Sequence, residues 1–242
     1  MNITGRISVK IAAILAVTLM CSCRYEFNNG VKGNGKITTD NREVNGDFSS
    51  IEVEGGLEVI VSQGEKSITV ETDDNLQRLI ETRIENGVLY IGTTEGVDSN
   101  ETPTVTVKSP ILNGLTASAG STITSTGRII TPKLIVESDS GSTISISVEA
   151  ENLSLEASGG SSIDARGKAI TLETSSSSGS SLDASDLRAN DVVAQASSGS
   201  STDVHPLVSL NASASSGSSI DYANRPKSLK KEESSGGSVS QN

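Results

Sequence analysis

The chain is poor in aromatic residues, which make up 2% of its 242 residues, and it contains no tryptophan. Between positions 91 and 221 there is no aromatic residue, because the five aromatics are Tyr25, Phe27, Phe48, Tyr90 and Tyr222. Any interior in that stretch must be built from Ile, Leu, Val, Ala, Ser and Thr. Such side chains suit thin stacked layers better than a bulky globular centre.

The residue types that nucleophilic and zinc-dependent catalysis need are also scarce. The only histidine is His205, and the only cysteines are Cys21 and Cys23. Zinc sites, Cys-His nucleophiles and Ser-His-Asp triads lack their parts unless His205 serves alone. His205 precedes Pro206, which favours a position in a surface turn. We therefore predict a non-catalytic protein that requires no cofactor.

Positive charge is the third scarcity. Nineteen Lys and Arg face thirty Asp and Glu, so the net charge is −11. Residues 1–22 carry two positive charges and no negative one, so without them the net charge is −11 − 2 = −13. An acidic surface disfavours nucleic acid and anionic lipid headgroups as partners.

The N-terminus has the layout of an export signal. Arg6 and Lys10 precede the apolar run 11–20, which is too short to span a membrane and ends at Cys21-Ser22-Cys23. A small residue before a cysteine resembles the lipobox of exported bacterial lipoproteins, although Met20 stands where such boxes usually carry Leu. We predict a signal peptide over 1–22, lipidation at Cys23 and a linker over 23–45; simple secretion is the alternative. The protein would then be held at the outer membrane by acyl chains, facing the periplasm or the outside.

A repeat of about 20 residues follows. Each unit contains a glycine that is followed by serine, and the later units read SGSTIS, GGSSID, SGSSLD, SGSSTD and SGSSID. The glycines are Gly120, Gly141, Gly160, Gly179, Gly199 and Gly217. Self-similarity at such a period indicates a solenoid, in which each unit buries its apolar edge against its neighbours.

Within each unit the side chains alternate. One and three residues after the glycine come Ser and then Ile, Leu or Thr, while the residues two and four after it are polar. A second alternating segment lies seven and five residues before the glycine, as in Leu153 and Leu155. Alternation predicts two strands per coil, joined by a Ser-Gly corner where glycine accepts positive φ. A variable third side would hold Gly127, Gly167, Leu187 and Pro206.

The predicted fold is therefore all-β: a single-stranded parallel β-helix with coils of about 19–20 residues, wound right-handed. It covers residues 46–224, with irregular N-terminal coils over 46–110 and regular repeats over 111–224. A small sheet capping the end is the alternative for the irregular part. Residues 225–242 are expected to form a flexible tail.

Two stacked rows follow from this fold. The outward residues Asp164, Asp183, Asp203 and Asp221 share one offset and would stack at about 4.8 Å. At that distance each pair repels by roughly 3 kcal/mol at an effective dielectric constant of 20. Solvation would relieve the repulsion, and so would a bound cation such as calcium. The inward serines are expected to form a ladder in which each hydroxyl donates to the next.

The aspartates also raise an alternative function, because β-helices that process polysaccharides use clustered carboxylates. Such enzymes need acids in a cleft with raised pKa values, whereas this row is a regular ladder beside Ser and Thr.

The lipoprotein start, the segment 47–91 and the recurring SGSSID units together resemble the family named "putative auto-transporter adhesin, head GIN domain", over roughly residues 45–224. The resemblance implies an all-β repetitive fold at the bacterial envelope and an adhesive role, and it offers no established catalytic residues to carry over. The expected partners are the membrane, through the lipid anchor, and glycans or proteins at the cell surface. A homo-oligomer is compatible with the repeats.

Overall fold

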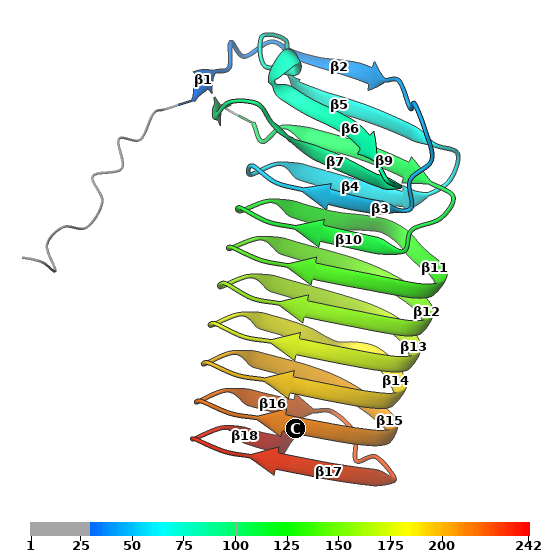
Figure 1. The fold of residues 1–242 in the computed structure, drawn as a ribbon, viewed down its shortest axis with the longest axis vertical. Helices are drawn as coiled ribbons and strands as arrows, with labels where there is room; N and C mark the ends of the chain where they lie inside the picture. The colour runs from blue at the N-terminus through cyan, green and yellow to red at the C-terminus, as the bar shows by residue number, and fades with distance from the viewer. Residues whose placement is uncertain (1–29, 100) are drawn as a thin grey trace, which may run out of the picture.

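The computed structural model describes residues 30–99 and 101–242, which are almost entirely β-structure (Figure 1). One short 3-10 turn, Gln77–Leu79, interrupts the strands. Among the described residues there is no helix long and apolar enough to cross a membrane. The expected signal peptide and Cys23 lie outside the described residues.

Long strands, stacked one above the next, form the regular part of the molecule (Figure 1). Each begins just after one Ser-Gly turn, crosses one face, bends, and returns across the other face to the next turn. Neighbours pair in parallel, with Ile144 beside Ile163 and Leu153 beside Leu172. The predicted β-solenoid is confirmed, and its strands are β10 (Gly114–Ala117), β11 (Thr122–Ser138), β12 (Thr143–Ala157), β13 (Ser162–Ser176), β14 (Ser181–Ala196), β15 (Ser201–Ala214) and β16 (Ser219–Tyr222).

The predicted alternation decides which side chains form the core. The residues three after each turn glycine are fully buried and stack by register: Ile123, Ile144, Ile163, Leu182, Thr202 and Ile220. Each buried Ile or Leu contributes about 1.5–3 kcal/mol, so a column of them holds successive coils together without aromatic bulk. The expected third side is instead the bend inside each long strand, where the register shifts between paired coils, as it does between Asp164 and Gly167.

The Ser-Gly corners are tight turns with two left-handed residues. Ser178 (φ 55°) and Gly179 (φ 72°) are the central pair of one turn, which the Ser180 N–H closes onto the Ser177 carbonyl at 3.2 Å. Glycine accepts positive φ without penalty, and serine at the same φ is uncommon. Five further corners place a non-glycine residue in this conformation: Ala119, Ser140, Ser198, Ser216 and Ser235.

The inward serine after each turn glycine is buried, and its hydroxyl links two coils. The Ser180 Oγ donates to the Ala157 carbonyl of the preceding coil at 2.8 Å and accepts the Ser177 N–H at 3.1 Å. Ser142, Ser161, Ser200 and Ser218 donate to the preceding coil in the same way. The expected hydroxyl-to-hydroxyl ladder is therefore wrong at these positions. Each of these hydroxyls instead donates to the carbonyl of the last strand residue in the preceding coil, as Ser180 does to Ala157 at the end of β12.

The N-terminal part contains both of the forms predicted for it, irregular coils and a small capping sheet. Strands β3 (Ser50–Val53) and β4 (Glu58–Gln63) pair in parallel with β10 and β11, and β7 (Val88–Thr93) and β9 (Thr104–Ser109) form the next level. Antiparallel strands then close the end: β5 (Ser67–Asp73) on β9, β2 (Ile37–Arg42) on β5, and β6 (Ile80–Glu85) on β7. Residues 46–110 are therefore coils that lead into a capping sheet.

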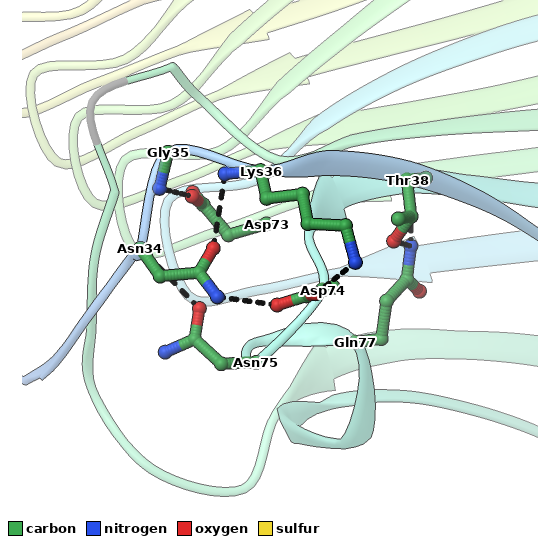
Figure 2. Close-up of polar contacts among 8 residues, drawn as sticks. All are labelled: Asn34, Gly35, Lys36, Thr38, Asp73, Asp74, Asn75 and Gln77. Atoms are coloured by element: carbon green, nitrogen blue, oxygen red, sulfur yellow. Dashed lines mark hydrogen bonds and ion pairs between the residues drawn. The ribbon is translucent and has the colours of Figure 1, made fainter.

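The expected linker is ordered from residue 31 onward, so that prediction is wrong for residues 31–42. Strand β1 (Val31–Lys32) pairs with β8 (Val97–Asp98), and the loop before β2 is held by the turn after β5 (Figure 2). The buried Asp73 accepts the Gly35 N–H, and Asp74 accepts the Lys36 ammonium at 2.9 Å. This clamp binds the N-terminal segment to the cap.

The predicted flexible tail is also wrong, because residues 228–241 form another coil. Strand β17 (Ser228–Glu233) pairs with β15, and β18 (Ser238–Gln241) pairs with β16. Lys231 and Glu233 occupy inward positions opposite Ala212 and Ala214. There Lys231 donates to the Val239 carbonyl at 2.7 Å, and Glu233 accepts the Val239 N–H at 2.6 Å. Charged side chains at inward positions discourage pairing with another strand edge.

The serine column can be tested by removing one hydroxyl. Ser180→Ala and Ser180→Val should each lower the free energy of unfolding by about 0.5–1.5 kcal/mol, because the Ser177 N–H and the Ala157 carbonyl each lose the hydroxyl and keep only their bond to each other. For a chain of this size that corresponds to about 2–4 °C in Tm per kcal/mol. Ser181→Val, at the exposed outward position next to it, is the control. An unchanged Tm for both Ser180 variants would show that the hydroxyl contributes nothing.

Candidate binding surfaces

The four predicted aspartates form one straight row. Parallel register places Asp164 beside Asp183, Asp183 beside Asp203, and Asp203 beside Asp221. They lie on the face that each strand crosses first after its turn, four residues beyond the turn glycine. The sequence therefore predicted this row residue by residue, because register in a solenoid follows from the repeat.

Asp164, Asp183 and Asp221 each accept short hydrogen bonds. Arg166 donates to both oxygens of Asp164, at 3.1 and 2.9 Å, and Ser185 donates its N–H and hydroxyl to Asp183 at 3.0 and 2.6 Å. The Ser240 hydroxyl, from the last coil, donates to Asp221 at 2.5 Å. The exposed Arg166 offsets part of the negative charge at Asp164, while the serines stabilise the Asp183 and Asp221 carboxylates by hydrogen bonding.

Asp203 lies between two acidic neighbours. Burial raises the pKa of Asp203, and the negative charges of Asp183 and Asp221 raise it further, while a hydrogen bond from Asn242 acts in the opposite direction. The described residues contain no group of three His, Cys, Asp or Glu side chains placed to hold a metal ion. Calcium binding at this row stays a prediction, and the donors beside Asp164, Asp183 and Asp221 favour a hydrated acidic row.

His205, the single histidine, lies in strand β15 at the bend and is half-buried. Its Nδ1 lies 2.9 Å from the Ser185 carbonyl, so the ring contributes to packing between coils. Cys23, the predicted lipidation site, precedes the described residues.

The structure adds a surface that the sequence did not reveal, a groove along the bends of the coils. This bend groove has a volume of about 610 Å³, and none of the four aspartates lines it. Its lining combines exposed apolar residues, small residues and charges of both signs: Ile130, Ile170, Leu207, Ala150, Ala169, Lys168, Arg188, Glu149 and Glu151. These lining residues recur at a spacing close to the repeat length. The bend is the variable part of each unit, however, so the residue types differ between coils and the sequence alone does not indicate the groove.

Because the pKa of Asp203 is raised, replacing its carboxylate by a neutral side chain should increase thermal stability by an amount that depends on pH. Because the pKa is higher in the folded state, the ionised carboxylate destabilises the fold at neutral pH, and this penalty disappears below the unfolded pKa of about 3.9. Asp203→Asn should therefore raise Tm at pH 7, with a gain that shrinks as the pH falls toward 3. Asp164→Asn, which loses its contacts with Arg166, should give no gain. A gain for Asp203→Asn that grows on acidification would contradict this assignment.

Comparison with known proteins places this architecture. Solved structures with the same fold include a putative adhesin from Bacteroides fragilis, with a TM-score of 0.82 at 19% identity over 88% of this chain and 100% of that one. A putative adhesin from Parabacteroides merdae has a TM-score of 0.73 at 21% identity, covering 88% and 98%. A putative lipid binding protein from Parabacteroides distasonis has a TM-score of 0.71 at 16% identity, covering 88% and 99%.

At these identities the solved structures establish the fold alone. No curated protein matched the chain. The family assignment comes from residues 47–226, which match the family described as "Putative auto-transporter adhesin, head GIN domain" and make up well over half of the chain. The sequence resemblance is thereby confirmed, and the chain belongs to this family.

Proposed function

We propose that the protein is a non-catalytic binding module of the bacterial envelope, an adhesin that presents the rows on the first face of its coils. The observation that carries the proposal is the parallel register of outward polar side chains. One such row begins at Thr122, and the next contains the aspartates. The first row is Thr122, Thr143, Ser162, Ser181, Ser201 and Ser219.

Rows of this kind suit a repetitive ligand. Hydroxyl and carboxylate groups recur at about 4.8 Å on a rigid frame, so a glycan or an extended protein segment can make several weak hydrogen bonds at once. Rigidity matters because the frame is already ordered before the ligand arrives, and binding then costs little conformational entropy. Family membership supports a role at the cell surface or outside the cell.

Lipidation at Cys23 would set the orientation of the solenoid. Gly30, the first described residue, follows Cys23 by seven residues, which can span at most about 25 Å. The clamp around Asp73 fixes this segment to the capping sheet. The cap would then lie near the membrane, and the regular coils that carry the polar rows would project away from it.

The anchor can be tested directly. Cys23→Ser should abolish incorporation of labelled palmitate and release the protein from the membrane fraction, because no acyl chain is then attached. Cys21→Ser, two residues earlier, is the control and should keep both properties. Full membrane retention of Cys23→Ser, or loss of label only in Cys21→Ser, would contradict lipidation at Cys23.

The adhesin proposal predicts an exposed protein with a localised binding face. External protease should degrade it on intact cells, and the purified chain should bind members of a glycan or host-protein array. The triple variant Ser162→Lys, Ser181→Lys and Ser201→Lys should reduce that binding at least about tenfold, because three long cationic side chains replace three hydroxyls of the row.

The matched control places Lys at Ser175, Gln195 and Ser213, a row on the returning face. Complete protection from external protease would remove the adhesin proposal. Equal loss of binding in the two triple variants would show that the first face is not the binding face.

A further inference from the structure

The bend groove has a floor of small side chains. Register places Thr131, Ala150, Ala169 and Ala189 at the same position in successive coils, where each strand turns back. The first three are 6%, 7% and 8% exposed, whereas the Ile and Leu columns of the core are almost completely covered. Small residues at the bend therefore leave a channel that runs across the coils, along the axis of the solenoid.

One wall of the channel exposes apolar side chains. Ile170 is 51% exposed and Leu207 is 36% exposed, while Ile130, on the other side of the floor, is 62% exposed. A second groove of about 560 Å³ shares Ile130 and extends the channel toward Ile111, which is 55% exposed. Exposed apolar side chains that gather in one groove mark a binding site more often than isolated apolar residues do.

Charged side chains of both signs lie at the same edge, where Glu149 and Glu151 line the bend groove together with Lys168 and Arg188. Residues 111–224 contain five Lys or Arg, and four of them line the two grooves or pair with a residue that does: Arg128, Lys133, Lys168 and Arg188. Glu149 pairs with Lys168 at 2.9 Å and with Arg128 at 3.5 Å. Within the described residues Arg188 makes no ion pair, so its guanidinium is available to a ligand.

The channel favours an acyl chain over a peptide or a glycan. The backbone N–H and C=O groups of the coils are used in the parallel ladders between them, so a peptide lying in the channel would leave its own backbone groups without partners. A glycan needs a hydrogen-bond partner for most of its hydroxyls, and the Ala150 and Ala169 side chains on the floor of the groove offer none. A hydrocarbon chain has no polar groups to satisfy, and it gains from every apolar contact.

We propose that the bend groove binds a long-chain fatty acid, with its carboxylate at Arg188 and its hydrocarbon along Ala169, Ala150 and Thr131. A planar guanidinium binds a carboxylate through two parallel hydrogen bonds. The levels of Arg188 and Ile130 are three strand spacings apart, about 14 Å. That length matches the half-thickness of a bilayer core, about 15 Å, which one acyl chain spans. This site lies apart from the polar rows and does not depend on the adhesin proposal.

Calorimetric titration with dodecanoate, below its micelle concentration, tests the proposal. The full chain with both cysteines replaced by serine carries no acyl group of its own. We expect one dodecanoate per chain and weaker binding of dodecylammonium, which has the opposite charge. Ile170→Asn should weaken dodecanoate binding at least about tenfold, and Arg188→Gln by about tenfold with loss of the preference over dodecylammonium.

Two controls match these variants. Val193→Asn changes an exposed apolar residue that does not line the groove, and Arg166→Gln removes a cation that also lies outside it. Both should leave the affinity unchanged, and both retain the apolar run 11–20, so uptake by that run cancels in the comparison.

Absence of binding, equal affinity of Ile170→Asn and wild type, or equal affinity for both headgroups would overturn the proposal. A dimer in light scattering that Ile170→Asn dissociates would also overturn it, because a second copy of the chain would then cover the groove.

Discussion

The solenoid depends on the turn that reverses the chain once per coil. Two consecutive left-handed residues, such as Ser178 and Gly179, make the reversal tight enough for the next strand to lie on the previous one. Left-handed serine is unfavourable by itself, so the turn needs support from its neighbours. The buried Ser180 hydroxyl supplies it, because it holds the Ser177 N–H within its own turn and the Ala157 carbonyl of the coil before. Turn geometry and coil stacking are therefore one hydrogen-bonded unit.

Once the turns are aligned, the properties of the other surfaces follow. Parallel register places like residues in columns, so Ile163 and Leu182 stack inside while Asp164 and Asp183 stack outside. Between positions 91 and 221 the interior needs no aromatic residue, because it is only two strands thick and each column is filled by its own repeat; Phe48 and Tyr222 are buried outside that stretch. The two edges differ for the same reason: turns lie along one edge, and small residues at the bends leave the groove along the other. A polar face and an apolar channel thus arise on a single frame.

The sequence predicted the features that obey the repeat. Offsets from the turn glycine identified the inward Ile column and the outward aspartates residue by residue. The left-handed serines were missed because a serine before glycine carries no distinct signal of its φ. The last coil was missed because Lys231 and Glu233 occupy apolar positions and Gly237 stands where the other coils have the inward serine. A charged residue fits an inward position only in a terminal coil, so the sequence predicts this coil only if the end of the solenoid is already known.

The cap and the groove required three-dimensional information of another kind. Alternation in residues 46–110 predicted strands but could not show that β5 would run antiparallel to β9. The groove depends on which side chains the bends bring together, and bulges there disturb the period. Hydrogen exchange at the turn amides tests the account most directly. Slow exchange, over hours, is expected for the Ser177 and Ser197 amides, because both are hydrogen-bonded to the preceding coil. Exchange of both within seconds, as in a flexible serine-glycine linker, would contradict it.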